Sequence, residues 1–117
     1  MTQKSFQEYY PESYAHCYGC GTLNEHGHHI QSYWDGDEIG LSLHAEIYHI
    51  SIPGYVYGGL LASLIDCHGT GTAAAALYNA AKEQDPNADP NTHAHRVTAR
   101  GLRQADSTGM NSKCAAR

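Results

Sequence analysis

The sequence predicts a single α+β domain in which an antiparallel hairpin precedes one long helix. Two observations lead to this fold class. Apolar and polar residues alternate on either side of the turn sequence DGDE at 35–38, which is the period of strands with one buried face. From Leu60 onward the apolar residues recur with the period of a helix. A chain of 117 residues is long enough for one core and too short for two.

Residues 1–28 are predicted to be an irregular lead-in to this domain. Pro11, Gly19 and Gly27 interrupt any regular period, so we expect at most one short helix here. The segment has no apolar stretch of the kind that a signal peptide carries, and no part of the sequence approaches the length of a membrane span. The sequence therefore predicts a cytoplasmic protein without a membrane partner.

The hairpin is predicted over residues 29–48. Gly36 supplies the turn chemistry between the two strands, and in each strand alternate residues share a face. The residues of this shared face are Ile30, Ser32 and Trp34 in the first strand and Ile39, Leu41, Leu43, Ala45 and Ile47 in the second. We expect this face of the hairpin to be buried.

The long helix is predicted over residues 58–80, after a loop in which Pro53 and Gly54 stop any strand. On a helical wheel one arc is apolar and should face the core, and it holds Leu60, Leu61, Leu64, Ile65 and Cys67. The other side holds small or polar residues, which are Gly59, Ser63, Asp66, Thr70 and Ala73. Gly69 and Gly71 each cost about 1 kcal/mol relative to Ala inside a helix, and we attribute their presence to close packing against a sheet.

Asp66 is the candidate catalytic group. Its face consists of small residues instead of Lys, Glu and Arg, which indicates a face that meets another backbone or a ligand. A carboxylate that is partly desolvated there can act as a general base or a nucleophile. The backbone amides of Gly58 and Gly59 at the helix start, reinforced by the helix dipole, can donate to an oxyanion.

The spacing of these groups predicts a site shared between two subunits. From Gly58 to Asp66 the helix rises about 12 Å, which is too far for one helix to present both groups to one carbonyl. Two antiparallel helices in a two-fold dimer would bring the N-terminus of one helix near Asp66 of the other. We therefore expect two composite sites per dimer.

Three segments resemble the hot-dog-fold acyl-CoA thioesterases of the phenylacetate-pathway type, within the 4-hydroxybenzoyl-CoA thioesterase superfamily. These segments are CYGCG at 17–21, which Asn24 follows, HISIPGYVYGGLLASLID at 49–66, and VTAR at 97–100. The resemblance implies a hot-dog fold, in which a curved antiparallel sheet wraps around one long central helix. It also implies a homodimer or homotetramer that hydrolyses an acyl-CoA thioester without a metal or a cofactor.

The same resemblance implies roles for single residues. Asp66 would be the catalytic carboxylate, and Gly58 and Gly59 would supply the amides that polarise the thioester carbonyl. Tyr57 stands where many relatives carry His, which keeps the backbone amide but changes the side-chain contact with the substrate. The residues expected to bind substrate are Asn24, His49, Tyr57, Ser63 and Thr98.

The C-terminal region departs from the family pattern. The family has two or three further strands after the segment that VTAR matches, whereas residues 96–117 show little period of either kind. We therefore expect C-terminal strands that are shortened or missing, in a chain truncated or frameshifted after about residue 100. An alternative function follows, namely a non-catalytic acyl-CoA-binding protein or a truncated hot-dog protein that only dimerises.

Charge and cysteine content argue against other classes of protein. Twelve acidic and seven basic residues give a net charge of −5, and no basic run is present to bind nucleic acid or an anionic membrane. The four cysteines are too few and too unevenly placed for a secreted disulfide framework, so we expect reduced thiols.

Two motifs leave other chemistry open. Cys17 and Cys20 could bind zinc together with downstream histidines, which are His26, His28 and His29. A packed pair of reduced thiols is the expected state of this segment. The sequence GTGTAA at 69–74 matches a dinucleotide-binding fingerprint, with Asp89 downstream, but its context suits a helix better than a strand followed by a loop.

Overall fold

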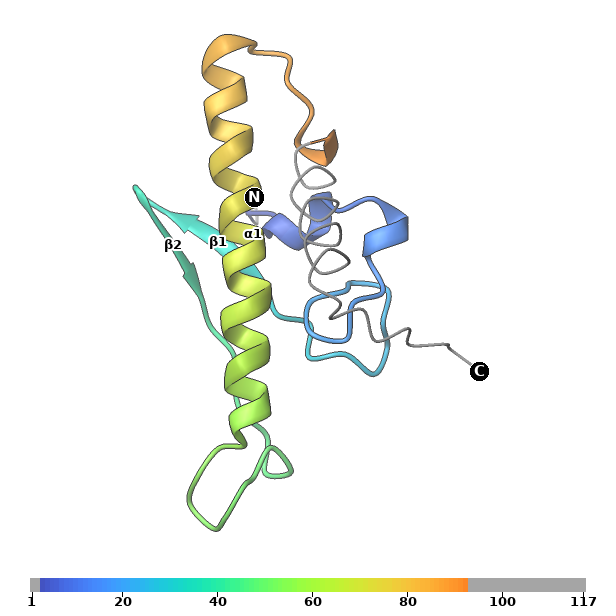
Figure 1. Cartoon of the computed structure of the whole chain (residues 1–117), viewed down its shortest axis with the longest axis vertical. Helices are drawn as coiled ribbons and strands as arrows, with labels where there is room; N and C mark the ends of the chain where they lie inside the picture. The colour runs from blue at the N-terminus through green and yellow to red at the C-terminus, as the bar shows by residue number, and fades with distance from the viewer. Residues whose placement is uncertain (1–2, 93–117) are drawn as a thin grey trace, which may run out of the picture.

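A computed structural model gives the structure of the chain, and it describes residues 3–92 (Figure 1). The elements that lie wholly within this range are two 3₁₀ turns, one hairpin and one long helix: η1 (Phe6–Tyr9), η2 (Glu12–Tyr14), β1 (Ser32–Asp35), β2 (Glu38–Leu41) and α1 (Gly58–Gln84); residues 90–92 are also helical. The fold class is therefore α+β, with a two-stranded antiparallel sheet and one long helix, as the sequence predicts. No helix in this range has both the length and the hydrophobicity that crossing a membrane requires.

The hairpin forms around the predicted turn but is shorter than predicted. Trp34 pairs with Ile39 across the turn, and Gly36 takes the positive φ of 64° that a two-residue turn of this kind needs at its first position. The prediction of strands over 29–48 is wrong at both ends, because β1 starts at Ser32 and β2 ends at Leu41. The ladder stops there because the backbone N–H of Ser32 donates to Gln7 Oε1 at 2.8 Å and the chain before it leaves the sheet.

Helix α1 begins at Gly58 as predicted and continues past residue 80 to Gln84. Its buried residues lie on one stripe: Leu60, Cys67, Gly71, Ala74 and Ala75. The prediction that Leu61 and Ile65 face the core is wrong, since they are 49% and 75% exposed. In Figure 1, β1 passes behind α1 and the lead-in lies beside the middle of the helix, so the described chain covers one side of α1 only.

The lead-in supplies a large share of the buried residues. From residue 3 to residue 28 the elements are two short 3₁₀ turns, η1 and η2, where the sequence predicted at most one short helix. Three polar or aromatic side chains of η1 and its cap, those of Ser5, Phe6 and Gln7, are nevertheless buried. They pack against α1 and β1, so this segment takes the place beside the helix that a longer sheet was expected to fill.

The two helix glycines have different surroundings. A Cβ at Gly71 would lie 3.0 Å from Gln7 Nε2, so this glycine allows close packing of the lead-in on α1. The prediction that Gly71 packs against a sheet is wrong. A Cβ at Gly69 would meet no atom within 4 Å in the described chain. The helix-propensity cost of Gly69 thus has no packing reason among residues 3–92.

The hydrophobic core is small and lies where the lead-in meets the hairpin and α1. Cys20, Ile30 and Cys67 form its buried centre, and the side chains packed against it are Tyr10, Leu41, Leu43 and Leu64. Ile30 is buried as predicted, whereas Ile47, which the sequence placed on the same face of the hairpin, is 88% exposed. The degenerate strand region predicted at 96–117 lies outside the described residues.

Candidate functional site

An open cleft of about 650 Å³ lies at the N-terminal end of α1. Its walls come from the lead-in, from the segment after β2 and from the first turns of the helix. Histidine and tyrosine dominate the lining, with His26, His28, His44, His49, Tyr18, Tyr48 and Tyr57. The cleft brings together four of the residues that the sequence singled out, which are His49, Tyr57, Gly59 and Ser63.

The first turn of α1 presents free backbone donors beside this cleft. Tyr57 occupies the N-cap without a side-chain hydrogen bond, and the first amide of the helix that finds an acceptor is that of Leu60, which donates to the Tyr57 carbonyl at 3.1 Å. The N–H groups of Gly58 and Gly59 have no acceptor among the described residues. The helix dipole adds partial positive charge at this point, so the two amides form a donor pair suited to a negatively charged oxygen.

The ring of Tyr57 lies directly over Gly59. A Cβ at Gly59 would collide with the Tyr57 ring, whereas a Cβ at Gly58 would meet nothing within 4 Å. The hydroxyl of Ser63 donates to the Gly59 carbonyl at 3.0 Å and closes the first helical turn. The phenol of Tyr57 is exposed and lines the cleft beside Gly59.

His49 is held in a fixed orientation on the opposite wall. Its carbonyl accepts the Tyr57 N–H at 2.9 Å, and its Nδ1 accepts the Glu46 N–H at 3.0 Å. Its ring lies 5.4 Å from that of His28 and 4.7 Å from that of Tyr48. Because Nδ1 accepts a hydrogen bond, the neutral ring carries its proton on Nε2, which is left as a donor.

Asp66 does not line the cleft. It lies further along α1, where its side chain is exposed. Around it the exposed face of the helix is made of apolar and small residues, which are Leu61, Ala62, Ile65, Gly69, Ala73, Ala76 and Leu77. The structure thus confirms that Asp66 sits among small residues and adds that exposed Leu and Ile side chains share its face.

Asn24 and Thr98 are not part of the cleft as described. The Asn24 amide donates to the His16 carbonyl at 3.0 Å and accepts the His26 N–H at 3.0 Å, so it fastens the loop that carries His26. Its contact with substrate stays a prediction. Thr98 lies outside the described residues.

Three cysteines meet one turn further along α1, where Cys17 and Cys20 of the lead-in reach Cys67, four residues after Ser63. The sulfur atoms of Cys17, Cys20 and Cys67 lie within 4.8 Å of one another, and the Sγ atoms of Cys17 and Cys67 are 4.0 Å apart. The loop histidines of the zinc shell that the sequence left open are not brought to Cys17 and Cys20. Among the described residues Cys67 takes their place, while His26 and His28 line the cleft.

The three thiols lie close enough to shift one another's pKa values. Bonds from the thiols of Cys20 and then Cys67, with further bonds from the backbone of Cys20 and Gly19, hold the pKa of the Cys17 thiol well below its ordinary value. The bond to Cys17 is also the largest cause that raises the pKa of Cys20, and it raises the pKa of Cys67 to about 12. These interactions favour negative charge on Cys17 over negative charge on Cys20 or Cys67.

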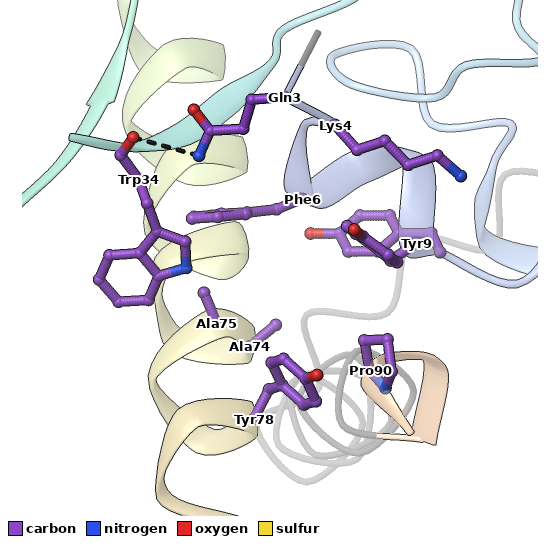
Figure 2. Close-up of a pocket in the computed structure, with 10 residues that line it drawn as sticks. Gln3, Lys4, Phe6, Tyr9, Trp34, Ala74, Ala75, Tyr78 and Pro90 are labelled. Atoms are coloured by element: carbon purple, nitrogen blue, oxygen red, sulfur yellow. Dashed lines mark hydrogen bonds between the residues drawn. The ribbon is translucent and has the colours of Figure 1, made fainter. Parts of the chain in front are cut away.

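A second, smaller cavity of about 190 Å³ lies beside the C-terminal half of α1 (Figure 2). Phe6 and Trp34 meet edge to face there with ring centroids 5.7 Å apart, and Gln3 donates to the Trp34 carbonyl at 3.3 Å. Ala74 and Ala75 form its floor on the helix. Eleven helix residues separate Ser63 of the cleft from Ala74, a rise of about 17 Å, so the two cavities are distinct.

The sequence missed Tyr18 and His44 in the cleft and Cys67 in the thiol cluster. The histidine-rich segment HGHH at 26–29 was a usable signal for the cleft, whereas Cys67 lies 50 residues from Cys17 and no local pattern joins them. The dinucleotide fingerprint at 69–74 is wrong, because these residues lie inside α1 and not in a loop after a strand. Comparisons with known protein families, with curated proteins and with solved structures find no match to this chain.

Proposed function

We propose that the chain is a hot-dog-type acyl-CoA thioesterase that works as a homodimer. The observation that carries the proposal is the uncapped N-terminus of α1, whose Gly58 and Gly59 amides stand unpaired beside a cleft lined with histidine and tyrosine. This arrangement agrees with the resemblance of residues 49–66 to the central motif of that family. The described residues form a two-stranded sheet. We propose the further strands of a hot-dog sheet together with the function.

In the proposed reaction the two amides donate hydrogen bonds to the oxygen of the thioester carbonyl. As water adds to the carbonyl carbon, the carbonyl oxygen becomes an oxyanion that accepts hydrogen bonds from Gly58 and Gly59. Asp66 of the partner subunit accepts the proton that the attacking water gives up. The tetrahedral intermediate then collapses, the carbon–sulfur bond breaks, and the CoA thiolate takes up a proton as the free acid leaves.

A second copy of the chain is needed because Asp66 and the amides are separated on one helix. Their separation of about 12 Å along the axis exceeds the reach of groups that act on one carbonyl. From Gly58 to Ala81, Asp66 is the one acidic or basic residue of α1 apart from His68. A helix that is apolar on all sides is usually buried on all sides, and an antiparallel α1 of a partner would cover the face that holds Leu61 and Ile65.

The lining of the cleft suits the CoA part of the substrate. Imidazole N–H groups and tyrosine hydroxyls donate to phosphate oxygens, and protonated histidine adds positive charge. The exposed rings of Tyr18 and Tyr48 offer faces on which an adenine base can stack. Glu46 is the single acidic residue of the lining.

The test is release of CoA thiol from short-chain and aryl CoA thioesters by the wild type and by Asp66→Asn. Loss of the general base should lower kcat by about 10² to 10⁴, while the sedimentation coefficient stays that of a dimer. Asp37→Asn is the matched control, because the Asp37 side chain is exposed in the hairpin turn.

Three outcomes would contradict the proposal. Equal rates for the wild type and Asp66→Asn would remove Asp66 from the reaction. Turnover by a monomer would remove the composite site. CoA binding in calorimetry without turnover of any thioester would instead favour the non-catalytic acyl-CoA-binding function.

A further inference from the structure

We propose that Cys17, Cys20 and Cys67 bind one zinc ion that fastens the lead-in to α1. This site is separate from the cleft and does not depend on the proposed function. The three sulfur atoms lie within 4.8 Å of one another, and those of Cys17 and Cys67 are 4.0 Å apart. Thiolates bound to a tetrahedral zinc at about 2.3 Å stand about 3.8 Å from each other. The sulfurs therefore need to approach by only about 1 Å or less to share one ion.

A disulfide fits the same cluster less well. The sulfurs of Cys17 and Cys67 would have to approach by about 2 Å to reach bonding distance, which is twice the largest shift that zinc requires. The third thiol would then remain buried without its partners, and an oxidant would be needed. Zinc binding needs no oxidant, since each of the three sulfurs gives up its proton to the solvent and bonds to the ion.

Two glycines shape the backbone around these sulfurs. A Cβ at Gly19 would collide with the Sγ of Cys67, and a Cβ at Gly21 would collide with the backbone of Cys17. The Gly21 N–H closes the turn with a bond to the Cys17 carbonyl at 2.8 Å. The backbone N–H groups of Gly19 and Cys20 point to the Cys17 sulfur. Such hydrogen bonds from outside the ligand set orient and stabilise metal-bound thiolates.

The surroundings of the cluster supply a further donor and an entry path. Tyr10 packs against Cys20 and Cys67, and its hydroxyl is buried without a hydrogen-bond partner among the described residues. This buried and unpartnered donor is costly, and it lies on a side chain that packs directly against the cluster. Cys17 is exposed, so the ion can enter on its side and water can complete the tetrahedron there.

The first experiment measures metal on the full-length wild type, purified under reducing conditions, loaded with zinc sulfate and freed of excess ion. We expect one zinc per chain by mass spectrometry of the metal. Loading with cobalt(II) should give the visible bands of a tetrahedral site and a near-ultraviolet thiolate charge-transfer band. A protein that retains no zinc, or a cobalt spectrum without thiolate bands, would overturn the proposal.

The second experiment compares Cys67→Ser with Cys114→Ser, which makes the same change at the remaining cysteine. We expect Cys67→Ser to weaken zinc binding by a factor on the order of 100 or more and Cys114→Ser to leave it unchanged. The reverse pattern would overturn the assignment of the ligands. Alkylation of the wild type gives a readout without any substitution. Bound zinc should slow the reaction of Cys17 with iodoacetamide, and a chelator should restore the original rate. An unchanged alkylation rate with zinc bound would contradict Cys17 as a ligand.

Discussion

Replacing Gln7 with Ala removes the side chain that joins the lead-in to the sheet and, through Ser32, to α1. The Gln7 side chain is 1% exposed, its Oε1 accepts the Ser32 N–H at 2.8 Å, and its Nε2 donates to the Ser32 hydroxyl at 3.4 Å. The Ser32 hydroxyl is in turn 3.0 Å from Nδ1 of His68 on the helix. In Gln7→Ala the Ser32 N–H stays buried without an acceptor, at a cost of about 1–3 kcal/mol. The lost methylene adds about 0.8 kcal/mol, so we expect the free energy of unfolding to fall by about 3 kcal/mol.

Urea unfolding followed by circular dichroism measures this change. The expected loss corresponds to a Tm lower by roughly 10 °C for a chain of this size. Gln3→Ala is the matched control, because Gln3 is exposed and its bond to the Trp34 carbonyl is long at 3.3 Å, so its effect should stay within about 0.5 kcal/mol. A Gln7→Ala protein as stable as the wild type, or equal losses in the two variants, would refute the role of the buried amide.

Two further changes test the packing of α1 and the start of the chain. Gly71→Ala should lower the Tm relative to Gly69→Ala, because its Cβ would meet Gln7 Nε2 at 3.0 Å while a Cβ at Gly69 meets nothing and gains about 1 kcal/mol of helix propensity. Thermal unfolding of the two variants measures this difference. A Gly71→Ala protein as stable as Gly69→Ala would contradict the close approach of Gln7 to the helix at Gly71. At Glu8, bonds from the Ser5 N–H at 2.6 Å and hydroxyl at 2.9 Å lower the carboxyl pKa below 4.5 in the folded state. This stabilisation is present above pH 4.5 and is lost as the pH falls through the folded pKa. Glu8→Gln should therefore lose less stability than the wild type between pH 6 and pH 3. Parallel profiles of stability against pH for the two proteins would contradict a stabilising bond between Glu8 and Ser5.

Local sequence signals predicted the position of the elements. The DGDE turn placed the hairpin because Gly36 takes a positive φ there at little cost. Pro53 and Gly54, followed by the change to a helical period, placed the start of α1 at Gly58. Each of these signals depends on a few neighbouring residues, which is why each could be recognised without knowledge of the fold.

The extent of the elements depended on contacts that the sequence does not display. The alternation from Leu41 to Ile47 is that of a strand, but a strand needs a partner, and β1 has only four residues to pair. Likewise Leu61 and Ile65 have the period of a core arc, yet the lead-in and β1 both approach α1 from the side of Leu60. Periodicity identified a face of the helix but could not specify what covers it.

The candidate site divides in the same way. The sequence alone determined that a glycine pair opens a long helix, that Asp66 lies two turns further among small residues, and that Cys17 and Cys20 are three positions apart, because these relations are fixed by spacing along the chain. Only the tertiary structure decided that histidines of the lead-in and of the segment after β2 form one cleft with Gly59, and that Cys67 joins the cysteine pair. The physical reason is that these side chains meet through packing of residues up to 50 positions apart. Gly19 and Gly71 allow the lead-in to pack this closely on α1 because neither has a Cβ atom.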